Sequence, residues 1–246
     1  MSRVALVTGA GHGLGRVIAG ALHRAGYRVA LGDLDGAAAG EGAAGLNPSS
    51  DTAIAVTMDV REKAGFERAL ATIVERWGGA DVLVNNAAAT AAKPLMDITA
   101  EEFDAVMAVN VRGTFLGSQV FGAHFRGRGH GRIVNMASLA GQNGGTATGA
   151  HYAASKGAIV TLTKVFARDL APHGVTVNAV APGPLDTPAV HRTIPAERMP
   201  ALLAGIPVGA LGDPAFVAGL VVQLASPEAG FATGATWDVN GGLYLR

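Results

Sequence analysis

The sequence predicts a single α/β domain spanning residues 1–246, built on a doubly wound, mostly parallel seven-stranded sheet flanked by helices. Its 246 residues are 49% hydrophobic and only 15% charged, which is enough apolar material for one large core. Short continuous apolar runs, typical of strands buried on both faces, recur along the chain. Helix-length segments separate these runs, and that alternation is typical of parallel sheets with crossover helices.

The expected strands and helices follow this alternation in order. Six apolar runs predict strands at residues 4–7, 29–31, 53–56, 82–84, 133–136 and 175–180, and a weaker seventh lies at 236–239. Helical patterns lie between them at residues 14–25, 62–77, 100–125, 150–170 and 214–224. Residues 37–45 are rich in glycine and alanine and have poor helix propensity, so the sequence predicts a helix there only weakly.

One segment, around residues 183–207, breaks the alternation. It follows the sixth expected strand and is interrupted by Pro184, Pro188, Pro195 and Pro200. One apolar helix face could be formed there by Ile194, Met199, Leu202, Leu203 and Ile206. Because ligands of open α/β sheets bind beyond the carboxyl ends of the strands, we expect this segment to be a substrate lid. The alternative is a surface loop with a short packed helix.

Charge and composition narrow the classes of function. The formal net charge is zero, so no global attraction to nucleic acid or to anionic membranes is expected. The chain has no cysteine, which rules out disulfides and thiolate metal sites, and no His, Asp and Glu cluster has convincing metal-ligand spacing. No signal peptide or membrane-spanning apolar stretch is visible, and we expect a soluble, cytoplasmic protein without a metal.

A glycine-rich turn, Thr8-Gly9-Ala10-Gly11-His12-Gly13-Leu14-Gly15, stands between the first expected strand and the first expected helix. In that context Gly9 permits a tight turn, Gly13 lets the backbone approach a pyrophosphate, and Gly15 lets the helix pack closely on the sheet. The phosphates would face the helix N-terminus. The pattern therefore indicates a Rossmann-type dinucleotide site, with an ordinary glycine-rich turn as the alternative.

Asp33 ends the second expected strand, where a carboxylate can accept hydrogen bonds from both hydroxyls of the adenosine ribose. The same carboxylate would repel a 2′-phosphate, Leu34 offers no cation, and His12 is the only basic candidate nearby. The sequence thus favours NAD(H) over NADP(H). Alternatively, Asp33 only caps the following turn.

Tyr152 and Lys156 lie four residues apart on an expected helix and so face the same way. An ammonium beside a phenol favours the phenolate, which predicts a lowered pKa for Tyr152 and a proton donor and acceptor near neutral pH. Ser138 precedes the tyrosine by fourteen positions. Taken alone, each of these residues has a plainer interpretation: a core tyrosine, a solvated lysine and a turn-forming serine.

In their order along the chain, these motifs resemble the short-chain dehydrogenase/reductases, in their compact single-domain branch. Asp59-Val60 is similar to the pair that meets the adenine ring, Asn85-Asn86-Ala87 to the strand-four motif, and Asn178 to Gly183, followed by Thr187, to the nicotinamide segment. Ala88 stands where the family has glycine, and the interval between Ser138 and Tyr152 is one residue longer than the commonest spacing. The resemblance implies a cofactor set of Gly9, His12, Gly13, Leu14, Gly15, Asp33, Asp59, Val60, Asn86, Ala87, Ala88, Tyr152, Lys156, Pro182, Gly183 and Thr187.

The resemblance also implies catalytic roles. Tyr152 is the acid/base, Ser138 orients the substrate oxygen, Lys156 lowers the pKa of the tyrosine and bonds the nicotinamide ribose, and Asn110 holds a water that links Lys156 to solvent. Gln142 and Asn143 could hydrogen-bond substrate, and His151 is expected to be partly exposed. Helices 100–125 and 150–170 would pack between copies in a homotetramer.

The expected function is an NAD(H)-dependent oxidoreductase that interconverts a secondary alcohol, or a 3-hydroxyacyl compound, and its ketone. The chain is most similar to the 3-oxoacyl-thioester reductase and alcohol dehydrogenase group, so an NADPH-dependent 3-oxoacyl thioester reductase is an alternative. Another is a dinucleotide-binding regulator without catalysis, although such proteins typically lose the tyrosine or the lysine. A nucleotide-sugar epimerase is disfavoured, because those enzymes usually carry a longer C-terminal domain.

Overall fold

A seven-stranded parallel sheet forms the centre of the protein. The computed structural model describes residues 2–49, 51–90, 92–145, 148–193 and 196–245. The strands stand in the order β3-β2-β1-β4-β5-β6-β7, and every neighbouring pair is parallel. Their bounds are β1 Val4–Thr8, β2 Arg28–Asp33, β3 Ala53–Thr57, β4 Val82–Asn85, β5 Gly131–Met136, β6 Val175–Pro182 and β7 Thr236–Val239. The predicted doubly wound sheet is confirmed.

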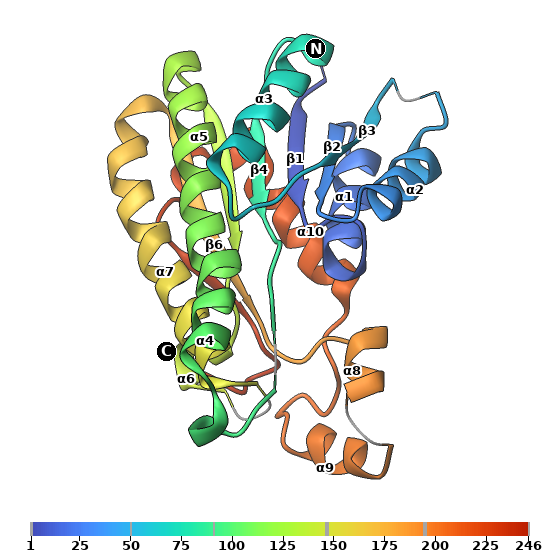
Figure 1. Ribbon diagram of the computed structural model, residues 1–246, viewed down its shortest axis with the longest axis vertical. Helices are drawn as coiled ribbons and strands as arrows, with labels where there is room; N and C mark the ends of the chain where they lie inside the picture. Colours follow the sequence, from blue (N-terminus) through green and yellow to red (C-terminus); the bar gives the residue numbers. More distant parts are fainter. Residues whose placement is uncertain (1, 50, 91, 146–147, 194–195, 246) are drawn as a thin grey trace.

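Helices cover both faces of this sheet (Figure 1). One layer holds α1 (Gly13–Arg24), α2 (Gly36–Leu46) and α10 (Pro214–Ala225). The other holds α3 (Lys63–Trp77), α4 (Ala100–Met107), α5 (Gly113–Arg128) and α7 (Ala150–Leu170). Short helices lie beyond the carboxyl ends of the strands: α6 (Ala140–Asn143), α8 (Pro188–Thr193) and α9 (Met199–Ala204). None of the helices in the described ranges is both long and apolar enough to cross a membrane.

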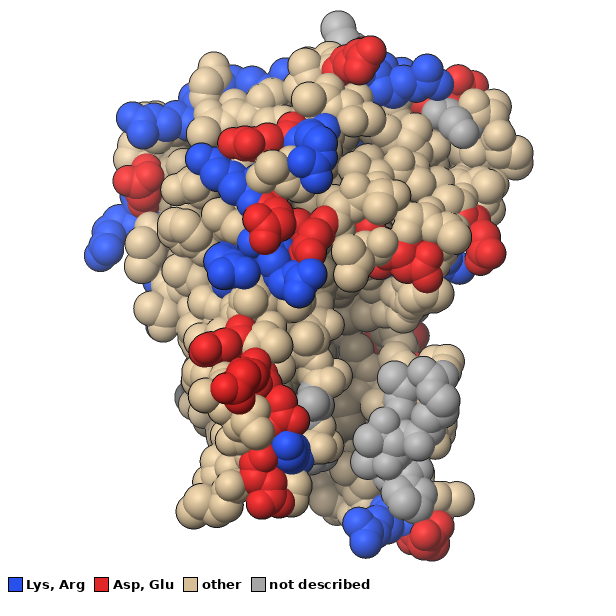
Figure 2. All heavy atoms as spheres, in the orientation of Figure 1, with Lys and Arg blue, Asp and Glu red and all other residues tan. Residues whose placement is uncertain are grey.

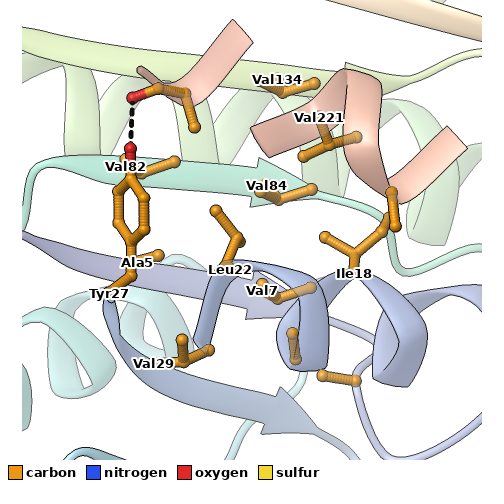
Figure 3. Packing of buried hydrophobic residues seen from close by; sticks show 14 of the residues in the cluster. Ala5, Val7, Ile18, Leu22, Tyr27, Val29, Val82, Val84, Val134 and Val221 are labelled. Atoms are coloured by element: carbon orange, nitrogen blue, oxygen red, sulfur yellow. Dashed lines mark hydrogen bonds between the residues drawn. The ribbon is translucent and has the colours of Figure 1, made fainter. Parts of the chain in front are cut away.

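Two apolar layers hold the helices to the sheet. Ile18 and Leu22 of α1 and Val221 of α10 pack against the strand valines on one face (Figure 3). On the other face Phe66, Phe121 and Phe125 are fully buried against the strands. Burial of such large side chains contributes roughly 1.5–3 kcal/mol each, so both layers stabilise the sheet that positions the site.

Two helices differ from expectation for identifiable reasons. Residues 37–45 do form a helix, because the Asp35 carboxylate caps it by accepting from the Ala38 amide at 3.0 Å, and its small residues pack closely on the sheet. The long helix predicted at 100–125 is interrupted by a π-helical turn at Ala108–Arg112. That turn contains Asn110, one of the predicted site residues.

The segment around residues 183–207 folds into α8, a 3₁₀ turn at Ala196–Arg198, and α9. Its base is fixed, because Leu185 and Gly212 form a parallel bridge and the Gly212 amide donates to the Pro184 carbonyl at 2.9 Å. Ile206 is buried, whereas Met199, Leu202 and Leu203 are not fully covered. Ile194 of the predicted apolar face and Pro195, one of the prolines that interrupt the segment, lie outside the described residues.

Candidate active site

A pocket of about 440 Å³ opens where the strand order reverses between β1 and β4. Chain connections leave in opposite directions at this point, so the carboxyl ends of the two strands diverge and leave a crevice. The pocket is lined by Gly9, His12, Leu14, Gly15, Asp33, Leu34, Asp59, Val60, Arg61, Asn86, Ala87, Ala88 and Val109. Most of the predicted cofactor residues therefore meet in one place.

The turn after β1 is held tightly to the end of β4. The Thr8 hydroxyl accepts from the amides of Asn86 at 3.0 Å and Ala87 at 3.1 Å. The Asn86 side-chain amide donates to the carbonyls of Thr8 at 2.9 Å and Gly9 at 3.2 Å. A Cβ on Gly15 would collide with the Gly9 carbonyl and would lie 2.5 Å from Asn86 Nδ2. Glycine is therefore required at position 15 for packing, as predicted.

Gly13 is different, because nothing lies within 4 Å of where its Cβ would be. Its φ of 53° is in the left-handed region that favours glycine. The bare backbone at the start of α1 thus faces open space. This is the arrangement that lets an anionic group approach a helix N-terminus.

Asp33 is fixed at the end of β2 by two backbone amides. Its Oδ2 accepts from the Gly11 amide at 2.7 Å, and its Oδ1 accepts from the Asp35 amide at 3.0 Å. The carboxylate therefore shapes the following turn, as the alternative interpretation proposed, and also lines the pocket. Each oxygen keeps a further lone pair that can accept a ligand hydroxyl.

Arg61 also lines the pocket, and sequence reasoning missed it. Its guanidinium donates two hydrogen bonds to Asp59 Oδ2, from Nε at 2.9 Å and from Nη2 at 2.6 Å. This pair holds the pKa of the Asp59 carboxyl below its ordinary value. His12, whose side chain is 73% exposed and 3.7 Å from the Asp35 carboxylate, is thus not the only basic group nearby, and that expectation was wrong.

Leu34 and Val109 are the other lining residues that were not predicted as contacts. All three omissions directly adjoin a predicted residue in the sequence: Leu34 follows Asp33, Arg61 follows Val60, and Val109 precedes Asn110. Their position next to a predicted residue was the sequence signal that could have identified them as pocket residues. In contrast, the pocket lining does not include Gly13, Tyr152, Lys156, Pro182, Gly183 or Thr187.

Ser138 and Tyr152 are brought together at the carboxyl end of β5. Ser138 follows the strand, its hydroxyl accepts from the Ala140 amide at 3.2 Å, and it hydrogen-bonds the half-buried Tyr152. Burial raises the pKa of Tyr152 above its ordinary value, and the hydrogen bond with Ser138 opposes that rise. The predicted lowering of this pKa by Lys156 was wrong for this arrangement.

The position of the Lys156 ammonium explains the difference. Nζ donates to the Met136 carbonyl at 2.6 Å and lies 5.5 Å from the centroid of the Tyr152 ring, on its face. The side chain is 2% exposed. Burial lowers the pKa of Lys156 itself to about 8, because the charged form loses its hydration. Tyr152 and Lys156 do share one side of α7, as their spacing predicts.

Asn110 is fully buried within the π-helical turn, and its side chain braces the loop after β4. Oδ1 accepts from the Ala89 amide at 2.7 Å, while Nδ2 donates to the Ala89 carbonyl at 3.0 Å and to the Ser155 hydroxyl at 2.9 Å. Both amide hydrogens are therefore in use. Ser155 adjoins Lys156 on α7, so Asn110 ties the pocket wall to the helix that carries the reactive pair.

Pro182 ends β6 and Gly183 follows it, where the Gly183 amide donates to the Val239 carbonyl at 2.8 Å. A Cβ on Gly183 would lie 3.0 Å from Asn240 Cα, so the chain passes close to the segment after β7. Thr187 precedes α8, and its hydroxyl accepts from the Val190 amide at 3.4 Å. These residues place the start of the 183–207 segment at the carboxyl end of the strands, the same end of the sheet at which the pocket opens.

Two expectations for side chains near Tyr152 stay predictions, and one needs correction. The Gln142 amide nitrogen donates to Asp238 Oδ1 of β7 at 2.5 Å, and Asn143 Oδ1 accepts from the Gly145 amide at 2.9 Å, so each side chain has one internal bond and keeps other polar atoms that could bond substrate. His151, predicted to be partly exposed, is 1% exposed, because it lies on the buried side of α7. Among the described residues no group of three or more His, Asp or Glu side chains is placed to hold a metal ion.

Comparison with known proteins agrees with this geometry. The profile of the family described as enoyl-(acyl carrier protein) reductase matches residues 9–244. Sorbitol dehydrogenase of Cereibacter sphaeroides is 37% identical, covering 99% of this chain and 98% of its own. 3-Oxoacyl-[acyl-carrier-protein] reductase FabG of Vibrio cholerae is 38% identical, with coverage of 99% and 98%.

A solved structure and a third relative extend the likeness. The crystal structure of a short-chain type dehydrogenase/reductase from Mycobacterium marinum superposes with a TM-score of 0.92 at 31% identity, covering 99% of this chain and 96% of that one. (3R)-3-hydroxyacyl-CoA dehydrogenase of Rattus norvegicus is 38% identical, with coverage of 99% and 97%. The chain therefore belongs to the short-chain dehydrogenase/reductase family, whose members are oxidoreductases that act on CH–OH groups.

Proposed function

We propose that the protein is an NAD(H)-dependent oxidoreductase that interconverts a secondary alcohol, or a 3-hydroxyacyl compound, and its ketone. The observation that carries the proposal is the pairing of Ser138, after β5, with Tyr152, which shares α7 with Lys156, at the same end of the sheet as the pocket lined by the glycine-rich turn. The relatives' names support the substrate class, because 3-oxoacyl and 3-hydroxyacyl groups are a ketone and a secondary alcohol.

The pocket residues fit a nicotinamide dinucleotide. Gly13 leaves open space at the start of α1, where a pyrophosphate would lie, and Asp33 has free lone pairs for the ribose hydroxyls. Asp59 and Val60 would contact the adenine ring of the dinucleotide. Asn86, Ala87 and Ala88 line the same pocket and would contact the part of the dinucleotide that lies closest to the end of β4. Pro182, Gly183 and Thr187 would hold the nicotinamide. When bound, the dinucleotide supplies or accepts the hydride.

Tyr152 moves the proton that accompanies the hydride. Because its raised pKa keeps the phenol protonated at neutral pH, it donates that proton to the oxygen of a ketone during reduction. In the oxidative direction the same phenol must first lose its proton. Ser138, already hydrogen-bonded to Tyr152, is placed to donate to the same oxygen and to orient it.

Lys156 and Asn110 have supporting roles. Lys156 holds a positive charge beside the Tyr152 ring and would bond the nicotinamide ribose by turning from the Met136 carbonyl. Asn110 positions α7 through Ser155. Because its side-chain hydrogens are in use, its backbone carbonyl, which accepts from the Thr114 hydroxyl at 2.8 Å and has a second lone pair, would hold the water that connects Lys156 to solvent. The 183–207 segment would close over substrate as a lid. Assembly as a homotetramer through the long helices, and a cytoplasmic location, complete the proposal.

The preference for NAD(H) rests on Asp33 and Leu34. A 2′-phosphate would lie beside the Asp33 carboxylate, and the Arg61 guanidinium, which also lines the pocket, is already paired with Asp59. The relatives named as 3-oxoacyl-[acyl-carrier-protein] reductases keep an NADPH-dependent thioester reductase as the alternative.

Fluorescence titration of the purified protein with NADH and NADPH, followed by a panel of secondary alcohols and ketones with the preferred cofactor, tests the proposal. Tighter NADH binding with turnover of secondary alcohols is the expected result. Tighter NADPH binding with turnover of 3-oxoacyl thioesters would replace it with biosynthetic reduction. Binding without turnover anywhere in the panel would leave only the dinucleotide-binding regulator.

A further inference from the structure

A second cavity, of about 210 Å³, lies at the end of the sheet opposite the dinucleotide pocket. It is lined by residues that precede β1, β4 and β5, begin β5, or end and follow α10: Arg3, Asp81, His130, Gly131, Arg132, Ala225 and Pro227. Because all strands are parallel, their full length separates this cavity from the carboxyl ends that carry Ser138 and Asp33. No residue is shared with the proposed active site.

Asp81, the carboxylate in the cavity lining, is already engaged by three donors. Its Oδ2 accepts from the Val4 amide at 2.8 Å. Its Oδ1 accepts from His130 Nε2 at 2.8 Å and from Arg128 Nη2 at 3.3 Å. Asp81 is therefore engaged by Arg128 and His130, and it is not available to the other cations of the cavity.

Arg3 and Arg132 have no carboxylate within ion-pair distance in the described part of the chain. Within the residues that the structure describes, the Arg132 guanidinium donates to neutral carbonyls, including those of Ser226 at 3.0 Å and Pro227 at 3.1 Å. Together with the bonds to the Gly131 and Gly174 carbonyls, these bonds use four of its five N–H hydrogens and leave its charge uncompensated. A partly buried charge without a counter-ion is costly, because it loses hydration without gaining an ion pair.

The two guanidiniums also repel each other. Burial lowers the pKa of Arg132, and the neighbouring Arg3 lowers it further. Exposed Glu228 is the remaining acidic group that both arginines influence, since Arg3 and Arg132 contribute to the lowered pKa of its carboxyl. One solvent-facing carboxylate offsets two positive charges only in part.

Tyr27 interacts with both Arg3 and the end of α10 at this cavity. Its hydroxyl donates to the Ala225 carbonyl at 3.0 Å, as Figure 3 shows, and Arg3 hydrogen-bonds the same side chain. Ala225 is buried and, with Pro227, forms an apolar part of the wall. The cavity thus combines a small apolar wall with two arginines whose positive charge is unmatched.

We propose that this cavity binds a small oxyanion, the phosphate or carboxylate group of a low-molecular-weight compound, through Arg3 and Arg132. The planar Arg3 guanidinium offers parallel N–H donors that match two oxygens of such a group, while Arg132 contributes its uncompensated charge and its remaining Nη2 hydrogen. The cavity size admits an anion with a short apolar portion, which would lie on Ala225 and Pro227. This site is independent of the proposed dehydrogenase activity.

The test is a titration of the full-length protein with inorganic phosphate or acetate at constant ionic strength, followed by amide chemical shifts. We expect saturable shifts at Val4, Gly131 and Arg132. Arg3→Gln should weaken binding about tenfold, the loss of one charge-assisted hydrogen bond. Glu228→Gln should strengthen it, because it removes the competing carboxylate. Stronger binding of phosphate or of acetate tells which oxyanion the site prefers.

Arg68→Gln is the matched control, since it removes one exposed positive charge from α3 and should leave the affinity unchanged. Phosphate can also bind at the start of α1, so shifts at Gly9 and Gly13 are followed separately. Shifts confined to that turn, or equal affinities in the wild type, Arg3→Gln and Arg68→Gln proteins, would overturn the proposal. Either result leaves the oxidoreductase proposal untouched.

Discussion

The buried ammonium of Lys156 makes the stability of the protein depend on pH in a specific way. Its pKa is lowered from 10.5 to about 8 in the folded protein. Between these values the unfolded chain holds a proton that the folded protein lacks, so the free energy of unfolding rises with pH. Below about pH 8 both states are protonated, and the stabilisation is absent.

The magnitude follows from the shift. A shift of one pKa unit corresponds to about 1.4 kcal/mol, so the full effect of Lys156 is about 3 kcal/mol, of which roughly 1.5 kcal/mol develops between pH 8 and pH 9.5. The comparison stops at pH 9.5 because the pKa values of Tyr27 and Tyr152 are raised in the folded protein. Above about pH 10 these two tyrosines therefore make the free energy of unfolding fall as the pH rises.

Urea unfolding of the wild type and of Lys156→Met at pH 8.0 and 9.5 measures this effect. The variant leaves the Met136 carbonyl unpaired, but that cost is the same at both pH values. We therefore expect Lys156→Met to lose the rise of roughly 1.5 kcal/mol between them. Lys164→Met, which removes an exposed lysine from the same helix, should keep it. An equal rise in the wild type and in Lys156→Met would refute the reasoning.

Three further predictions concern the pocket and the residues next to it. Gly15→Ala should lower the free energy of unfolding in urea by about 3 kcal/mol, because the added methyl group collides with the Gly9 carbonyl. Gly13→Ala should lower it by about 1 kcal/mol and weaken NADH binding at least tenfold. A larger loss of stability in Gly13→Ala than in Gly15→Ala would contradict this. Asp33→Ala should lower the preference for NADH over NADPH about tenfold in a fluorescence titration, and an unchanged ratio would remove Asp33 from cofactor choice. Asn110→Leu should cost about 2–4 kcal/mol, since the Ala89 amide and Ser155 lose their partner, and a loss below 1 kcal/mol would show that Asn110 is not a brace.

The order of the elements could be predicted from the sequence because strand and helix signals are local. Continuous apolar runs mark six of the seven strands of the observed sheet, β7 has a weaker signal, and α7 matches its predicted bounds, Ala150–Leu170. The π-helical turn at Ala108–Arg112 could not be predicted, because it depends on long-range bonds from Asn110 to Ala89 and Ser155. Helix α2 forms through its Asp35 cap and its close packing, which helix propensity does not include.

The site was predictable by residue type and spacing but not by orientation. The pocket does contain Gly9, Gly15, Asp33 and Asp59. Spacing could not show that the Lys156 ammonium turns to the Met136 carbonyl, and the pKa of Tyr152 was mispredicted for that reason. Contacts made by long side chains, such as the grip of Arg61 on Asp59, depend on three-dimensional placement.

The most direct measurement of the central claim is a single-turnover assay of hydride transfer from a secondary alcohol to NAD⁺, in the wild type and in Tyr152→Phe. The variant removes only the phenolic oxygen, so NADH affinity should be unchanged. Its rate should fall by at least 10², the contribution of a positioned acid or base. Hydride transfer at the wild-type rate in Tyr152→Phe, with NADH affinity retained, would contradict the assignment of Tyr152 as the proton-transfer group.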